Sequence, residues 1–323
     1  MKKYLLPREG TFYKANMHCH STVSDGKLTP EELKAAYKER GYSIVAFTDH
    51  EIIKAHPELE DEEFLPITAA EIAFTNKEIP FRFRKETHLN IYARQKNNTP
   101  DANAVFGEGD CRRHSAENIN RAIKTARENG FIVCYNHPQW SLETIIDFSK
   151  YEGCFAMEVY NTGCDEDPFT ITDEWNEASY GALCRMGRKI FPICSDDNHN
   201  GLTPDDRYYD SFGGFIMIKS GELKYDAVFS AIERGDFYAS QRPEIYELYA
   251  EDGIIHIKTS PSYEIRFITE GRKGLCRRTS DKSALNSAEF EFPENDSFVY
   301  VMVTDFSGKR AVSRAYFKDE ILP

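Results

Sequence analysis

Six apolar segments, each with the length and composition of a buried β-strand, constrain the fold of this 323-residue chain more than any other feature. Each contains, or is directly followed by, a histidine, aspartate or glutamate that can bind a metal ion. The segments lie at residues 14–20, 43–50, 65–71, 87–92, 131–137 and 190–199. Near-continuous runs of Val, Ile and Phe are typical of parallel strands that are covered on both faces.

Patterns with helical spacing separate these segments. Thr29 and Pro30 form a helix-start signal and Gly41 a stop, and further helix starts are predicted at Ser115, Ser141, Thr172 and Tyr225. Strands that alternate with helices predict a parallel sheet with right-handed crossovers. The number of strands indicates an α/β barrel.

Most of the potential metal-binding residues lie near the carboxyl ends of the predicted strands, where the side chains would meet in such a barrel. His18 and His20 flank Cys19, and side chains two residues apart on a strand point to the same face. The working groups of these barrels sit at the carboxyl ends of the strands. His88 is the exception, because it lies early in its apolar segment.

Each of these residues also has a purely structural explanation. His88 and His137 fit core histidines that are hydrogen-bonded to backbone carbonyls. Glu71 fits a charge at a helix N-terminus, and Asp197 and His199 fit loop-capping residues. Six of the nine histidines nevertheless belong to the ordered set, which favours a shared metal site over independent structural roles.

The order His-x-His, an acid, Asp-His, Glu, His, His and Asp-x-His resembles the PHP family, named for polymerase and histidinol phosphatase domains. The stretch from His18 to Leu33 is especially similar to its stand-alone metal-dependent phosphoesterases, and the resemblance spans roughly residues 11–240. It implies a distorted (β/α)7 barrel with two to three divalent metal ions. The first ion would be held by His18, His20, Glu71 and Asp197, the second by Glu71, His88 and His137, and the third by Asp25, His50 and His199. Many relatives have a histidine at the position of Asp25.

Imidazole and carboxylate ligands suit zinc, manganese or iron, and paired ions suit displacement at phosphorus. We therefore expect a phosphatase or phosphodiesterase that cleaves a small metabolite or nucleotide through a metal-activated hydroxide. Glu71 would bridge two ions, and His50 or His199 would protonate the leaving group if the third ion is absent. Asp49 and Asp196 would orient ligand histidines. Arg112 and Arg113 are either a phosphate clamp or two solvated arginines.

Two other classes of function remain open. Similar barrels that begin with His-x-His also hydrolyse carbon–nitrogen bonds, although they usually rely on a carboxylated lysine at a strand end, and no lysine here has that place. A metal-stabilised scaffold without activity is the second alternative.

The amino-acid composition limits the kinds of molecule that this chain is expected to bind. A net charge of −13 and a pI near 5.3 argue against an extended nucleic-acid surface and favour a small phosphorylated substrate. The eight cysteines include no C-x-x-C pair and predict a reducing, cytoplasmic location. No segment is apolar for long enough to predict a membrane span. The oligomeric state stays open.

The pattern changes after residue 240. Short alternating segments with a hairpin signal at Asp252 and Gly253 predict a small β-sandwich, immunoglobulin-like in outline, at residues 241–323. The barrel would then occupy residues 1–240.

Overall fold

The computed structural model describes residues 2–165, 175–281 and 283–322. The strands before residue 241 are β1 (Lys3–Tyr4), β2 (Thr11–Cys19), β3 (Ile44–Phe47), β4 (Leu65–Thr75), β5 (Glu86–Ala93), β6 (Phe131–Tyr135), β7 (Ala156–Asn161), β8 (Phe191–Ser195), β9 (Phe215–Ser220) and β10 (Phe237–Ser240). The helices of this part are α1 (Pro30–Glu39), α2 (Ala102–Phe106), α3 (Ala116–Glu128), α4 (Ile145–Phe148), α5 (Thr162–Asp165), α6 (Glu177–Arg185) and α7 (Tyr225–Arg234).

Local sequence signals explain where several helices begin. Thr29 caps α1 in a reciprocal pair with Glu32, and Ser115 caps α3, so both predicted starts are confirmed. The predicted start at Ser141 is wrong, since α4 begins at Ile145. Ser141 instead donates its backbone N–H to the carbonyl of His137 and so belongs to the loop after β6. Thr172 lies outside the described residues.

The sheet is mixed, not parallel as predicted. Strands β2–β3–β4 and β6–β7–β8 pair in parallel, whereas β5 runs antiparallel to both β4 and β6. The connection from β4 to β5, residues 76–85, holds only a short 3-10 turn at Phe81–Phe83. A parallel return needs a crossover of a dozen or more residues, so this connection forms a hairpin.

The predicted α/β class is confirmed, but the barrel is open. Strand β8 returns toward β2, where one parallel bridge joins Cys19 to Asn198. Among the described residues, no continuous ladder joins these two strands. Strand β9 pairs antiparallel with β2, and β10 pairs antiparallel with β9.

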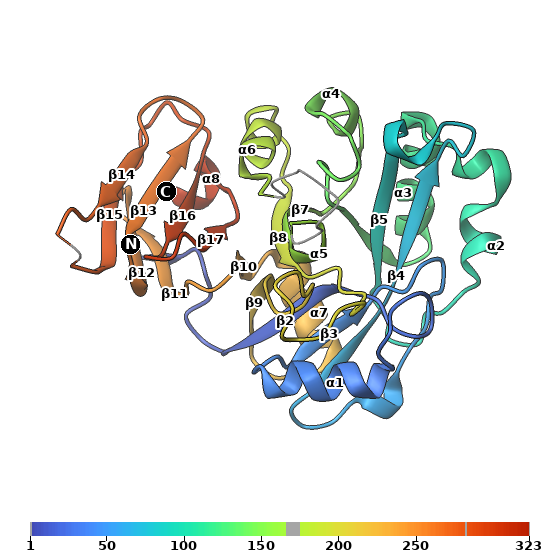
Figure 1. The fold of residues 1–323 in the computed structure, drawn as a ribbon. Helices are drawn as coiled ribbons and strands as arrows, with labels where there is room; N and C mark the ends of the chain where they lie inside the picture. Colours follow the sequence, from blue (N-terminus) through green and yellow to red (C-terminus); the bar gives the residue numbers. More distant parts are fainter. Residues whose placement is uncertain (1, 166–174, 282, 323) are drawn as a thin grey trace.

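The C-terminal part forms the smaller lobe of Figure 1, and both termini lie in it. Its elements are β11 (Ile245–Glu251), β12 (Ile254–Ser262), β13 (Glu264–Thr269), β14 (Leu275–Arg278), β15 (Leu285–Glu291), β16 (Phe298–Thr304), β17 (Arg310–Ser313), β18 (Tyr316–Phe317) and α8 (Lys318–Ile321). One sheet has the order β1-β11-β12-β15, and the other contains β13, β14, β16 and β17. Leu248 and Ile257 of the first sheet share a core with Phe267 and Val301 of the second.

The two lobes share backbone hydrogen bonds. Strand β10 pairs with β17, so one sheet continues across residue 240, and β1 pairs with β11 of the C-terminal lobe. The boundary at residue 240 therefore stays a prediction. No helix in the described ranges is both long and apolar enough to cross a bilayer.

Candidate metal centre

The predicted ligands meet at one edge of the mixed sheet. His18 and His20 come from the end of β2, His50 follows β3, Glu71 lies within β4, and Asp197 and His199 follow β8. His88 opens β5, and its position is explained by strand direction. Because β5 runs antiparallel to β4, with His88 opposite Ala73, the start of β5 lies at the same edge as the ends of its parallel neighbours.

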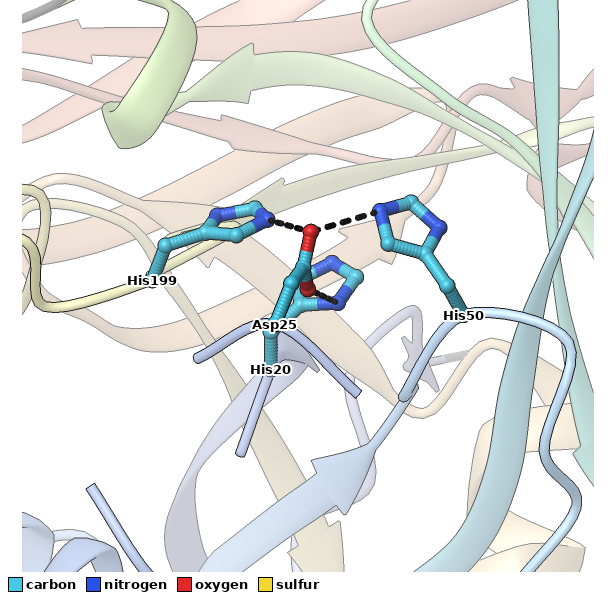
Figure 2. A group of neighbouring side chains, drawn as sticks. All are labelled: His20, Asp25, His50 and His199. Carbon is cyan, nitrogen blue, oxygen red and sulfur yellow. Dashed lines mark ion pairs between the residues drawn. The ribbon is translucent and has the colours of Figure 1, made fainter. Parts of the chain in front are cut away.

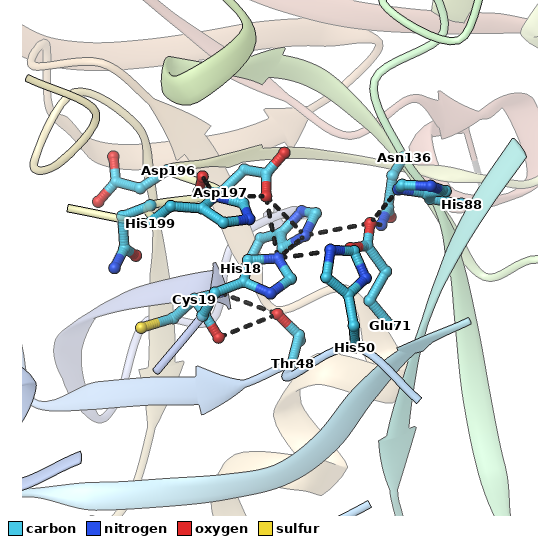
Figure 3. Close-up of polar contacts among 12 residues, drawn as sticks. His18, Cys19, Thr48, His50, Glu71, His88, Asn136, Asp196, Asp197 and His199 are labelled. Carbon is cyan, nitrogen blue, oxygen red and sulfur yellow. Dashed lines mark hydrogen bonds and ion pairs between the residues drawn. The ribbon is translucent and has the colours of Figure 1, made fainter. Parts of the chain in front are cut away.

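The first group of donors consists of His18, His20, Glu71 and Asp197. Figure 3 shows three of them, His18, Glu71 and Asp197. The Nε2 atoms of His18 and His20 lie 3.1 Å apart, and Asp197 Oδ1 lies 3.1 and 3.0 Å from them. Glu71 Oε1 lies 3.2 Å from His18 Nε2. All four side chains are buried.

These distances fit a coordinated cation. Four ligands about 2.0–2.1 Å from a tetrahedral ion lie roughly 3.3 Å from one another. Two imidazole nitrogens that face each other at 3.1 Å can both act as acceptors only if a cation or proton lies between them. The donor set and its spacing therefore fit zinc or a similar first-row ion.

The second group shares Glu71 with the first. Glu71 Oε1 lies 3.0 Å from His88 Nδ1 and 3.4 Å from His137 Nε2. Asn136 Nδ2 donates to the same oxygen at 2.8 Å, which fixes the carboxylate between the two groups. Glu71 thus belongs to both groups, and its role as a bridging ligand stays a prediction.

The third group contains Asp25, His50 and His199, as predicted, together with His20 (Figure 2). Asp25 Oδ2 lies 3.6 Å from His50 Nε2 and 3.5 Å from His199 Nε2, and its Oδ1 lies 3.6 Å from His20 Nδ1. The assignment of His20 to the first ion alone is therefore too narrow. Its ring lies between two groups and turns one nitrogen toward each, and the buried Nδ1 atom makes no hydrogen bond within the described structure.

Charge pairing dominates the electrostatics. Burial lowers the pKa of His20, but Asp197 and Glu71 raise it to about 9. Burial likewise opposes ionisation of Glu71, yet His88 and His18 hold the pKa of this carboxyl well below its usual range. Without metal, His20 thus carries a proton among carboxylates, whereas burial lowers the pKa of His50 to about 4. A cation that binds beside His20 takes the place of that proton.

Glu158 is a site residue that the sequence predictions missed. It is buried in β7, and its Oε1 atom lies 2.8 Å from His18 Nδ1. Its other oxygen accepts the backbone N–H of His137 at 2.9 Å. A carboxylate that holds the far nitrogen of a ligand histidine fixes the ring and its tautomer. The available signal was a glutamate in the middle of an otherwise apolar strand segment.

The roles predicted for Asp49 and Asp196 are wrong, because neither carboxylate contacts a histidine ring within the described residues. Asp49 accepts hydrogen bonds from the backbone and hydroxyl groups of Ser21 and Ser24. It thereby holds the turn that leads to Asp25. Asp196 accepts from Tyr37 and Thr162 and from the backbone of residues 212–214. Both carboxylates anchor loops.

A cavity of about 1120 Å³ opens beside the three groups. Its walls include His50, His88, His137 and His199, with Trp140 on one side. A substrate therefore has room next to the candidate ligands.

Arg112 and Arg113 also line this cavity. Arg112 Nη2 donates to Glu51 Oε2 at 2.5 Å, and its side chain is only 14% exposed, so it is not a solvated arginine. Arg113 pairs with Glu78 and is half exposed. Because both guanidinium groups already have carboxylate partners, the phosphate clamp stays a prediction.

Comparisons with known proteins show what parts of the chain are similar to. Residues 16–103 match the model of the PHP domain. A 5′-3′ exoribonuclease of Haemophilus influenzae is 43% identical over 47 residues, which are 15% of this chain and 17% of that protein. The chain thus matches only a small part of that curated relative.

Two solved structures align with this chain. A two-domain protein of Bacteroides vulgatus, described as containing a predicted PHP-like metal-dependent phosphoesterase, aligns with a TM-score of 0.50 and 13% identity, over 98% of this chain and 97% of that one. A proposed metal-dependent phosphoesterase of Bifidobacterium adolescentis aligns with a TM-score of 0.42 and 15% identity, over 62% of this chain and 91% of that one.

The matched segment contains the predicted ligands His18, His20, Asp25, His50, Glu71 and His88. The resemblance that the sequence shows is therefore confirmed, with residues 16–103 matching the PHP domain.

Proposed function

We propose that this protein hydrolyses a phosphate ester of a small metabolite or nucleotide at the metal centre. The observation that carries the proposal is the convergence of three overlapping donor groups on one side of an open cavity. Divalent ions, when bound there, would lower the pKa of a water molecule and neutralise charge on the phosphate oxygens.

The side chains of the centre divide into two kinds. Glu71, His18 and His137 are buried and held by hydrogen bonds, which suits them to hold ions in fixed positions. His50 and His199 are partly exposed and face the cavity, with side-chain exposures of 29% and 36%. Either ring could transfer a proton to a leaving oxygen or complete the third group, and we propose both roles for testing.

The decisive experiment combines metal analysis with a phosphate-release screen over sugar phosphates, nucleotides and phosphodiesters. Glu71→Ala should lower both metal content and turnover, the latter by about a hundredfold or more, because loss of a shared ligand removes several kcal/mol of charge stabilisation. Glu264→Ala is the matched control, since Glu264 is also a buried carboxylate but lies in the C-terminal sheet.

The screen separates the alternatives. Phosphate release that is unaffected by Glu71→Ala would disprove the proposal. Amine release from amides without phosphate release would instead support a carbon–nitrogen hydrolase. A protein that retains its metals and turns over neither class would support the scaffold. Nucleic-acid diesters belong in the screen because the Haemophilus relative is an exoribonuclease.

A further inference from the structure

The hairpin between β4 and β5 presents unusual side chains beside the cavity. Residues 77–83 are all exposed, and the rings of Phe81 and Phe83 are 61% and 64% exposed. Exposed aromatic groups that gather on one element often mark a binding site. Nothing in the proposed hydrolysis itself requires these rings.

The hairpin is connected to the metal centre through Trp140. The Trp140 ring centroid lies 4.8 Å from that of His137 and 5.3 Å from that of His88. Phe81 packs against Trp140 at 6.2 Å. We call Trp140, Phe81 and Phe83 the aromatic rim. It leads from the candidate ligands to the outside.

The hairpin is also basic, although the whole chain carries a net charge of −13. Residues 77–85 contain four basic residues and one acidic residue. The Arg82 guanidinium lies 4.4 Å from the Phe83 ring centroid, and that of Arg84 lies 5.2 Å from the Phe81 ring centroid. Arg84 pairs with Glu86, but no carboxylate of the described structure pairs with Arg82 or Lys77.

Aromatic rings that alternate with basic side chains favour a ligand that has both a flat ring and phosphate groups. Every nucleobase has a flat face that stacks on aromatic side chains, while arginines attract the phosphates and stack in turn. A simple sugar phosphate would use the metal centre but not the aromatic rim. An apolar protein partner would make no use of the unpaired cations.

We propose that the aromatic rim binds a nucleobase of the substrate, and that this protein therefore prefers nucleotides to other phosphate esters. The proposal deepens the proposed phosphoesterase function and rests on it. Trp140 would stack on the base nearest the ions, and Phe81 and Phe83 would extend the surface outward. Arg82 and Lys77 would face phosphate groups beyond the scissile one.

The first test compares two esters with the same scissile bond, AMP and ribose 5-phosphate, using the metal-loaded full-length protein. We expect Phe81→Ala and Phe83→Ala to lower kcat/KM for AMP by about tenfold, as the loss of one base–aromatic stack implies. Turnover of ribose 5-phosphate should stay within about twofold of wild type. Phe306→Ala is the control, because this phenylalanine is 52% exposed but lies in the C-terminal lobe.

Equal losses for the two esters would overturn the proposal while leaving the phosphoesterase function intact. A dimer that forms in sedimentation experiments and is abolished by Phe81→Ala would also overturn it, in favour of docking between copies of this chain.

The second test needs no turnover. The chain contains two tryptophans, so Trp175→Phe leaves Trp140 as the single reporter of fluorescence. Millimolar adenosine should quench this signal, ribose should not, and Phe81→Ala should weaken the quenching several-fold. Adenosine has no phosphate, so quenching supports the aromatic rim even if neither ester is cleaved. No quenching by adenosine would overturn the proposal.

Discussion

At the scale of single residues, the most consequential contact joins the buried side chains of His18 and Glu158, which lie 140 residues apart in the sequence. Glu158 faces His18 Nδ1 and also accepts from Ser195 Oγ and Asn161 Nδ2. Burial disfavours its charge, but the neighbouring His18 keeps the pKa of Glu158 below its usual value. The carboxylate therefore stays ionised and holds the ring of His18 with its Nε2 atom toward the first group.

We predict that Glu158→Gln lowers metal affinity by about 10- to 100-fold, the range found when a partner of a ligand histidine is removed. The amide is similar in size but cannot stabilise the same tautomer through a charged hydrogen bond. Competition with a chromogenic chelator measures the affinity. The control is Glu143→Gln, because Glu143 is a buried carboxylate that accepts from Thr87, His114 and Tyr135 and touches no candidate ligand.

Unchanged metal affinity in Glu158→Gln, with the control also unchanged, would show that His18 needs no partner. A loss of affinity in both variants would point to general destabilisation.

Single residues also show the limit of prediction from sequence. The candidate ligands could be found because each is a chemically distinctive residue at or near the end of an apolar run. The roles of Asp49 and Asp196 could not be found, because loop anchoring depends on which backbone N–H groups fold back onto a carboxylate. Nothing in the spacing of Ser21, Ser24 and Asp49 encodes that contact.

At the scale of elements, strand direction decides which residues meet. The sequence predicts β5 correctly as an apolar strand, but periodicity carries no information on direction. The only sequence signal for a hairpin is the short connection between β4 and β5. Because the hairpin reverses the chain, His88 near the start of β5 lies at the same edge of the sheet as the other candidate ligands. The N-termini of α1 and α3 could be predicted because N-caps depend on contacts within four residues.

The turn at residues 21–25 depends on Asp49. Substitution of Asp49 should therefore affect only the third group of donors, which contains Asp25. We predict that Asp49→Ala reduces the number of bound metal ions by one, because Asp25 is no longer held near His50 and His199. Elemental analysis of the purified protein measures the stoichiometry. Asp61→Ala, which removes an exposed carboxylate bound to lysines, is the control.

An unchanged metal count in Asp49→Ala would mean that Asp25 reaches its position without the turn. Loss of every ion would mean that the turn supports the whole centre.

At the scale of the whole molecule, the continuous sheet links the metal centre to the C-terminal lobe. Tyr238 to Ser240 of β10 pair with residues 311–313 of β17. Tyr180 of α6 accepts the backbone N–H of Ala315 at 2.6 Å, and Tyr300 bonds to Glu177. Phe298 and Tyr300 belong to the same apolar core as β6, β7 and β8. Near residue 240 the sequence changes from apolar strands that alternate with helices to short strands of alternating polarity. This change does not show whether the apolar cores of the two lobes are separate.

We therefore predict that a chain ending at Ser240 does not fold stably. It would leave β10 as an unprotected edge, remove the partners of Tyr180, and expose apolar side chains of the larger core to water. Soluble yield, far-UV circular dichroism and metal content, each compared with the full-length protein, measure the effect. A folded, monomeric fragment that binds the full set of metals would instead establish residue 240 as a domain border. The β10–β17 ladder would then be a docking contact between two independent units, and the role of the C-terminal lobe would have to lie outside the stability of the centre.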